Sequence, residues 1–153
     1  MLDQEVLRAN RRLRLTNALA ECCAERGYEA TTVGHILVRA RMARATFYAE
    51  FANKEAAFID LLQRGTTELL GRVEAACAAA DGDWHVHLEA GLGAVLDWIA
   101  ADPPVADVCL IHAQAVADSG GAIQRGAIRK LVELLRGNAP ADAARPATIE
   151  DLL

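Results

Sequence analysis

Long apolar runs are missing from this sequence of 153 residues. No stretch approaches the roughly 20 apolar residues that a membrane-spanning helix requires. The first residues, MLDQEVLRANRRLRL, also lack the apolar segment of a secretory signal peptide. We therefore expect a protein without a membrane partner, located in the cytoplasm.

Proline and runs of β-branched residues are scarce as well. The chain has four prolines, whereas alanine and leucine are abundant. Hydrophobic residues make up 53% and charged residues 24% of the chain, which excludes an intrinsically disordered protein. This composition favours helices over strands. The expected fold class is all-α.

Cysteine pairs with metal-binding or redox spacing are absent. The four cysteines form no CxxC motif, and Cys22 and Cys23 are adjacent, so they cannot usefully bond to each other. Cys22 falls on the same helical stripe as Leu15, Ala18 and Leu19, which indicates a small core residue. Redox sensing is the alternative. The histidines also lack the spacing of a metal site, so no metal and no other cofactor is expected.

Residues 31–54, TTVGHILVRARMARATFYAEFANK, have the pattern of two short helices joined by a tight turn. In the first helix Val33, Ile36, Leu37 and Ala40 recur at helical spacing and form one apolar face. Thr31 or Thr32 precedes this face and can cap the helix through its side-chain oxygen.

The second helix is expected over residues 43–51 and has two aromatic residues one turn apart, Phe47 and Phe51. Because these rings are expected to face the core, the opposite face is directed toward solvent, and it consists of Arg44, Ala45, Tyr48 and Ala49. Such a surface suits insertion into a DNA groove. The alternative is a helical hairpin that only packs.

Positive charge is concentrated near the N-terminus. The whole chain has a net charge of −5, but residues 1–54 hold nine Lys and Arg against six acidic residues. They therefore carry +3, and the remaining residues carry −8. A basic N-terminal part on an acidic body suits phosphate binding at one end, although ordinary solvated surface charge is the alternative.

The same region resembles the DNA-binding domain of the TetR family of transcriptional regulators. The resemblance covers about residues 11–60 and rests on GYEATTV (27–33), Ile36, Ala40, ATFY (45–48), Phe51 and NKEA (53–56). It implies an N-terminal three-helix helix-turn-helix DNA-binding domain of residues 1–54. It also implies a helical regulatory domain for ligand binding and dimerisation, residues 55–153.

The resemblance further implies which residues contact DNA. Tyr48 and Lys54 carry over directly as contacts to the phosphate backbone; the alternatives are a half-buried packing residue for Tyr48 and a solvated side chain for Lys54. From their own chemistry, Arg41 and Arg44 add positive charge near the turn, and the alternative for Arg44 is to read a guanine edge through its guanidinium. The full set of expected DNA-binding residues is Arg11, Thr32, Arg41, Arg44, Ala45, Thr46, Tyr48, Ala49 and Lys54.

Three positions depart from the family pattern. Arg41 stands in the turn where glycine is usual, and Ala43 stands where the recognition helix usually starts with Ser or Thr. Ala43 supplies neither a cap nor a hydroxyl group for phosphate. Glu50 replaces a frequent histidine, and we expect its carboxylate to repel a phosphate.

Apolar periodicity predicts four further helices, at about 54–80, 84–101, 103–117 and 122–136. Gly65 and Gly71 are expected to weaken the first of these, and residues 119–121 to separate the last two. The candidate ligand-binding residues of this region are Trp98, Cys109, His112 and Gln114. For His112, an ordinary hydrogen-bonded core histidine is the alternative.

The C-terminal residues continue this pattern only briefly. Residues 138–146, NAPADAARP, are typical of a loop, and residues 147–153 of the opening of another helix. TetR-family members dimerise through two last helices, and these are missing here. We therefore expect the regulatory domain to be incomplete at its C-terminus.

Together these inferences favour a homodimeric, ligand-responsive transcriptional regulator, usually a repressor in this family, bound to a palindromic double-stranded DNA operator. Its effector would be a small apolar or amphipathic molecule of unknown identity, and no enzymatic activity is expected. One alternative is an enzyme using His112 and Cys109, although no nucleophile, base and orienting group have recognisable spacing. The other is a helical protein-interaction module with a degenerate helix-turn-helix.

Overall fold

The computed structural model describes residues 2–137 and 139, and every regular element in this part of the chain is helical. The elements are α1 (Leu2–Ala30), α2 (Val33–Ala40), α3 (Arg44–Glu50), α4 (Lys54–Ala79), α5 (Trp84–Ala101), α6 (Pro103–Asp107), η1 (Val108–His112), η2 (Ala113–Ala115) and α7 (Ala117–Arg136). The predicted all-α fold class is confirmed. Within these residues, none of the helices combines the length and the apolarity needed to cross a membrane.

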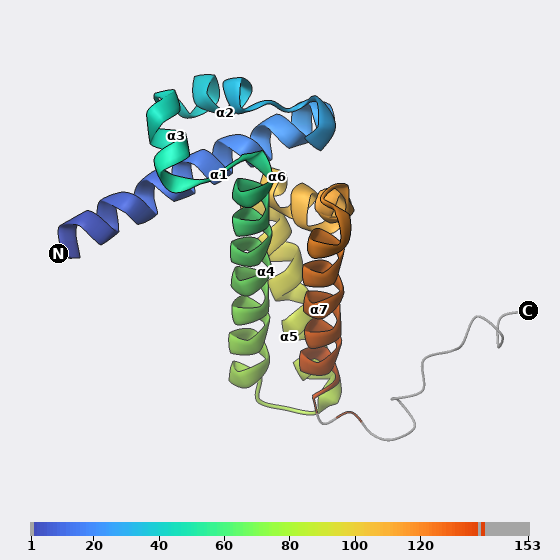
Figure 1. Cartoon of the computed structure of the whole chain (residues 1–153). Helices are drawn as coiled ribbons and strands as arrows, with labels where there is room; N and C mark the ends of the chain where they lie inside the picture. The colour runs from blue at the N-terminus through green and yellow to red at the C-terminus, as the bar shows by residue number, and fades with distance from the viewer. Residues whose placement is uncertain (1, 138, 140–153) are drawn as a thin grey trace, which may run out of the picture.

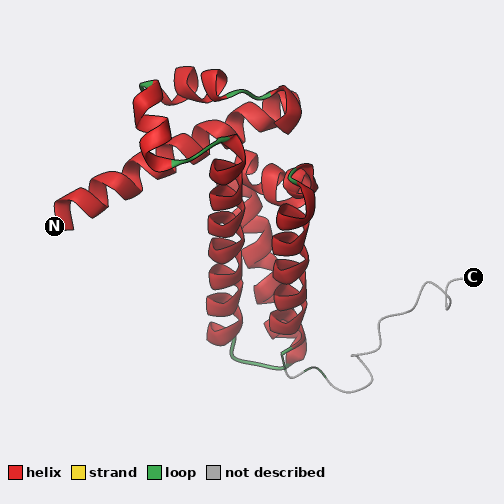
Figure 2. Ribbon diagram, viewed as in Figure 1, coloured by secondary structure: helices red, strands yellow, loops and turns green. Residues whose placement is uncertain are grey.

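The helices form two layers that meet at α1 (Figure 1). Helices α4, α5 and α7 stand side by side as an upright bundle, and α4 contacts both of the others. Helix α1 crosses one end of this bundle, with α2 and α3 packed on its far side and α6 at the junction. Short loops join the helices (Figure 2).

A continuous apolar core connects the two layers. Leu15 and Leu19 of α1 and Phe58 and Leu61 of α4 are fully buried in it. The ring of Tyr28 packs edge-on against Phe58, with 4.6 Å between the ring centroids. The predicted division after residue 54 stays a prediction, although α4 does begin at Lys54.

Helix α4 runs without interruption through both of its glycines, Gly65 and Gly71. A Cβ atom at Gly65 would lie 2.6 Å from Cys109 Sγ and 3.1 Å from Val105 Cγ1, so this glycine lets α6 and η1 approach α4 closely. A Cβ atom at Gly71 would meet nothing within 4 Å. Gly65 is therefore a packing residue rather than a weak point of the helix.

The single helix predicted over residues 103–117 is divided into α6, a π-helical turn (η1) and a 3₁₀ turn (η2). The amide of Gln124 on α7 donates hydrogen bonds to the carbonyl oxygens of Cys109 (3.1 Å) and Leu110 (2.9 Å). These side-chain donors satisfy carbonyl groups where the regular α-helical hydrogen bonding is interrupted. This contact from a distant helix could not be inferred from local periodicity.

Helix α7 begins five residues earlier than predicted, at Ala117, so residues 119–121 lie inside the helix and do not form a separating loop. A Cβ atom at Gly120 would lie 2.0 Å from the carbonyl oxygen of Ala113. The glycine thus allows the start of α7 to pack directly on the backbone of η2. The predicted loop of residues 138–146 and the predicted helix start at 147–153 lie outside the described residues, apart from residue 139.

Candidate nucleic-acid interface

Helix α3 presents one buried face and one exposed face, as its sequence predicts. Phe47 is fully buried and Phe51 is 3% exposed, with 5.8 Å between their ring centroids. On the opposite face the exposed residues are Arg44, Ala45, Tyr48 and Ala49, whereas Thr46 is half-buried. The Tyr48 side chain is half exposed and its ring packs edge-on against Phe47. Burial of Phe47 and Phe51 therefore determines which face of α3 is accessible to a partner.

The turn before α3 is built around Arg41, which adopts a left-handed backbone conformation with φ 52° and ψ 52°. Its N–H donates to the carbonyl of Val38 (3.3 Å), and the N–H of Met42 donates to Leu37 (3.1 Å). These bonds close the C-terminus of α2. The conformation explains why the family pattern has glycine here, because a non-glycine residue pays a steric cost in it.

Helix α3 has no side-chain cap. Ala43 occupies the N-cap position with an extended backbone, and it has no polar atom to accept a hydrogen bond from the first turn. By contrast, Thr32 caps α2 in a reciprocal arrangement with His35: its Oγ1 accepts from the His35 N–H at 3.2 Å, and its own N–H donates to His35 Nδ1 at 3.3 Å. The Thr32 hydroxyl is thus engaged in capping, and its predicted DNA contact stays a prediction.

Glu50 lies on the buried face of α3, and its side chain is only 2% exposed. Its two carboxylate oxygens accept hydrogen bonds from Arg8 Nε and Arg11 Nε, each at 3.0 Å. The carboxylate therefore faces α1 and is neutralised there, which is a different role from the phosphate repulsion expected from the sequence. Arg11, predicted to contact DNA, is 44% exposed and holds Glu50 in place.

Two more arginines of α1 bind the C-terminal ends of the short helices. Arg12 Nη1 donates to the carbonyl of Glu50 at 2.9 Å, and Arg14 Nη2 donates to the carbonyl of Ala40 at 2.9 Å. The Arg12 guanidinium also lies over the Phe51 ring, 4.3 Å from its centroid. Positive charge at a helix C-terminus is favourable. The arginines of α1 thus fasten α2 and α3 to α1.

Ion pairing within the N-terminal helices leaves Arg41 and Arg44 as exposed cations. Arg39 pairs with Glu21 and Glu25, and Arg26 pairs with Glu25. In the part of the chain that the structure describes, no carboxylate lies within 4.0 Å of the guanidinium of Arg41 or Arg44. The uncompensated positive charge therefore flanks the start of α3, beside its exposed face.

Lys54 fastens the start of α4 to the end of α1. Its Nζ donates to the carbonyls of Tyr28 (2.8 Å) and Thr31 (2.9 Å) and lies 3.9 Å from the centroid of the Tyr28 ring. An ammonium group has three N–H donors, so one is left for another acceptor. The structure gives Lys54 a positioning role, and its predicted phosphate contact stays a prediction.

The four candidate ligand-binding residues are not gathered at one site. Trp98 and Cys109 are both buried and meet at Gly65, where they form part of the core. Burial raises the pKa of the Cys109 thiol to about 12. His112 is half-buried with its Nε2 3.2 Å from an oxygen of Asp107, and Gln114 is exposed. The involvement of these residues in ligand binding stays a prediction.

Sequence reasoning missed the contacts of Glu50 with Arg8 and Arg11, although a signal was present. Glu50 follows Phe47 by three residues, so it shares the helical stripe that directs Phe47 inward. An acidic residue on a buried stripe requires a positively charged partner. The arginine-rich stretch of α1 was the available source of one.

Comparison with known proteins agrees with this geometry. Residues 15–61 match the family model described as bacterial regulatory proteins, tetR family. A crystal structure of a bacterial regulatory protein in the tetR family, from Rhodococcus RHA1, is similar with a TM-score of 0.73 and 24% sequence identity; the match covers 92% of this chain and 75% of that one. No curated protein matches the chain. Residues 15–61 are therefore similar to the DNA-binding region of the tetR family of regulatory proteins, and the chain has the same fold as the solved tetR-family structure.

Proposed function

We propose that this protein is a ligand-responsive repressor that binds a palindromic operator as a homodimer. The observation that carries the proposal is the exposed face of α3, with Arg44, Ala45, Tyr48 and Ala49 directed outward beside the unpaired Arg41. This face combines positive charge, a hydroxyl group and small side chains, which suits a helix that enters the major groove.

The proposed contacts follow from the chemistry of each side chain. Arg44 is the candidate for base recognition, because its planar guanidinium can bind two acceptors of a guanine at once. Arg41, Tyr48 and Thr46 supply donors for phosphate oxygens, while Ala45 and Ala49 allow close approach to the bases. Arg11, Thr32 and Lys54 contribute mainly by holding the helices in position, because Arg11 and Lys54 donate to acceptors within the protein and the Thr32 hydroxyl oxygen accepts from the His35 N–H.

Dimerisation and ligand release complete the proposal. Two copies related by a two-fold axis would place two α3 helices in successive major grooves, which explains why a palindromic site is expected. A small effector bound among the helices after residue 80 would favour a different separation of the two α3 helices and so weaken DNA binding. We place the protein in the cytoplasm with its operator, and the proposal includes no catalytic step.

The test uses purified protein and the DNA immediately upstream of its own gene. Binding is measured at two salt concentrations against a scrambled duplex of the same length and composition. We expect sequence-selective binding that weakens steeply with salt, because protein cations displace counterions from the phosphates. Equal affinity for both duplexes, with the protein folded, would contradict the proposal and favour the protein-interaction module.

A matched pair of arginine variants refines the test. Arg44→Ala removes an unpaired cation from the α3 face, whereas Arg26→Ala removes an arginine of α1 that pairs with Glu25. If Arg44 reads a base, its loss weakens binding to the operator more than to scrambled DNA. If Arg44 binds phosphate, both affinities fall equally and the salt slope decreases by about 1. Arg26→Ala should change neither.

A further inference from the structure

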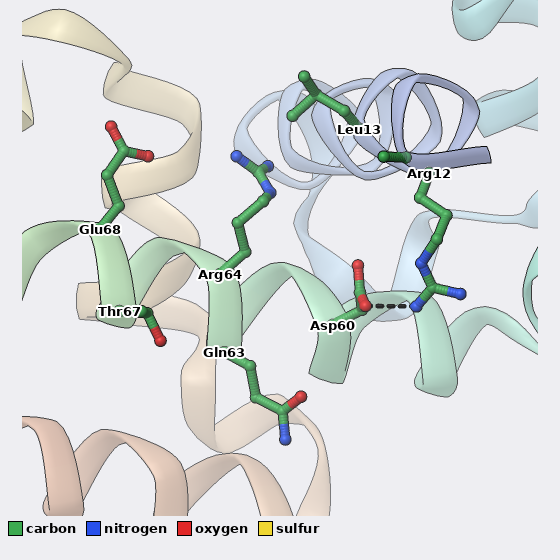
Figure 3. Close-up of a pocket in the computed structure, with 8 residues that line it drawn as sticks. Arg12, Leu13, Asp60, Gln63, Arg64, Thr67 and Glu68 are labelled. Atoms are coloured by element: carbon green, nitrogen blue, oxygen red, sulfur yellow. Dashed lines mark hydrogen bonds and ion pairs between the residues drawn. The ribbon is translucent and has the colours of Figure 1, made fainter. Parts of the chain in front are cut away.

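An open groove separates α1 from α4 on the side of the protein shown in Figure 3. Its volume is about 560 Å³, within the range of roughly 300–1,000 Å³ typical of small-molecule sites. Ala9 and Leu13 line it from α1, and Asp60 and Arg64 line it from α4. The groove is therefore bounded by one helix of the DNA-binding region and one helix of the bundle.

The acidic groups of this groove are already neutralised. Asp60 forms an ion pair with Arg12, which Figure 3 shows bridging the two helices. Glu68, also at the groove, pairs with Arg72 one turn further along α4, with 2.7 Å between the oxygen and nitrogen. Each of these carboxylates pairs with another arginine, and neither forms an ion pair with Arg64 among the described residues.

Arg64 is the cation without an acidic partner. In Figure 3 its side chain extends from α4 toward α1, between Asp60 and Glu68. Its guanidinium bonds only to neutral groups, with Nη2 2.7 Å from Asn17 Oδ1 and 3.4 Å from Thr16 Oγ1. Among the described residues, its Nε is buried and has no hydrogen-bond partner. A half-buried guanidinium in this state is electrostatically unsatisfied and favours an anion.

Apolar surface lies next to this positive charge. Leu13 is 41% exposed at the groove and Ala9 is exposed one turn before it on α1. We propose that the groove binds a small amphipathic carboxylate, whose carboxylate group pairs with Arg64 and whose apolar part covers Leu13 and Ala9. A carboxylate matches the geometry of a guanidinium, and burial of the apolar part supplies hydrophobic stabilisation.

The position of the groove gives the ligand a regulatory consequence, which rests on the proposed repressor function. Arg12 links α1 to α4 at the groove through Asp60 and also binds the Glu50 carbonyl at the end of α3. A ligand between α1 and α4 therefore contacts the helix that holds α3. The ligand changes the affinity for DNA if it binds the DNA-bound arrangement of these helices and the DNA-free arrangement with different affinities. The size of the change equals the ratio of those two affinities.

The test measures binding of sodium decanoate to the full chain without DNA, by isothermal titration calorimetry below the micelle-forming concentration. We expect saturable binding at one site, and binding weaker by about tenfold or more for methyl decanoate, which lacks the charge. Indole-3-acetate serves as a second carboxylate of different shape. Failure of both carboxylates to bind at millimolar concentration would overturn the inference.

Variants locate the site. Arg64→Gln should weaken carboxylate binding by about tenfold or more. Leu13→Glu places a negative charge in the groove and should also weaken carboxylate binding by about tenfold or more. Because Leu13 is at the surface, this variant tests the site independently of whether Arg64→Gln folds. Val6→Glu is the matched control, since Val6 is also an exposed apolar residue of α1 but does not line this groove. Equal affinities of wild type, Leu13→Glu and Arg64→Gln would overturn the inference.

Because this titration contains no DNA, its result is independent of the operator experiment. Carboxylate binding with no operator selectivity would contradict the repressor function and leave the site intact. Operator selectivity without carboxylate binding would contradict the site and leave the repressor function intact.

Discussion

Arg11 on α1 and Glu50 on α3 are joined by a hydrogen-bonded ion pair, with 3.0 Å between Arg11 Nε and Glu50 Oε1. The glutamate side chain is 2% exposed, whereas the arginine side chain is 44% exposed. The acidic residue of α3 is thus directed inward, away from the exposed face of this helix. These contacts set the orientation of α3 on α1 and therefore determine which face of α3 is exposed to solvent.

Glu50→Gln should destabilise the protein by about 1–2 kcal/mol. The charged hydrogen bonds from Arg8 and Arg11 are lost, but both arginines remain partly solvated, so the cost stays below that of an isolated buried charge. Urea denaturation followed by circular dichroism measures the change. Glu29→Gln, at an exposed position of α1, is the control and should stay within about 0.5 kcal/mol of wild type. Equal stability of the two variants would show that the Glu50 contacts contribute little.

Ala43→Ser should stabilise the protein by about 1 kcal/mol. Ala43 already has the extended backbone of an N-cap residue, and serine would add the hydroxyl that accepts a hydrogen bond from the first turn of α3. The same denaturation experiment applies. A decrease in stability would mean that the start of α3 does not have the conformation described.

Two alanine substitutions on α4 should have opposite effects. Gly65→Ala would place a methyl group 2.6 Å from Cys109 Sγ and should destabilise the protein by about 1–3 kcal/mol. Gly71→Ala meets open space and should stabilise it by about 0.5–1 kcal/mol, since alanine is the better helix former. Thermal unfolding of both variants checks the pair, and stabilisation by Gly65→Ala would contradict the close packing of η1 on α4.

Much of this architecture could be predicted from the sequence because the signals are local. Phe47 and Phe51 determine the outward face of α3, and a threonine determines the start of α2. The divided helix after Pro103 could not be predicted, because it depends on hydrogen bonds from Gln124 on a different helix. The role of two glycines could not be predicted either. Gly65 and Gly120 allow close contacts between helices, whereas helix propensity alone identifies a glycine only as a residue that weakens a helix.

The candidate site was predicted in part. The α3 surface follows from helical periodicity, so its exposed residues were identified correctly. The partners of Arg11, Glu50 and Lys54 are 23 to 42 residues away along the chain, and such pairings depend on tertiary structure. For this reason the sequence alone did not show that Arg11 and Lys54 also hold helices together, and their DNA contacts stay predictions.

The cysteines should react slowly with thiol reagents in the folded protein. All four are buried, and burial raises the pKa of Cys23 to about 11 and of Cys109 to about 12, so little thiolate is present at pH 8. Titration with a chromogenic disulfide reagent should detect four thiols only after denaturation. Rapid reaction of the native protein would instead support the redox alternative.

The same shifts predict a loss of stability at alkaline pH. In the unfolded chain these thiols ionise near their ordinary pKa of 9.0, whereas folded Cys109 retains its proton until about 12. The unfolded state therefore releases more protons between these values, and the free energy of unfolding should fall as pH rises from 9 toward 12. Replacing Cys109 with alanine should reduce this pH dependence, measured by urea denaturation at several pH values.

The proposed role of the exposed α3 face in DNA binding is tested most directly by placing a carboxylate on that face. Ala49→Glu adds negative charge and bulk to this face, while Ala75→Glu makes the same change at an exposed position near the C-terminal end of α4. Surface changes of this kind should leave the folding stability of both variants near that of wild type. We predict that Ala49→Glu weakens operator binding by about tenfold or more, because a carboxylate is repelled by the phosphates and the added side chain keeps α3 out of the groove. Ala75→Glu should bind as wild type, and equal operator affinity of the two folded variants would contradict the assignment of α3 as the DNA-reading helix.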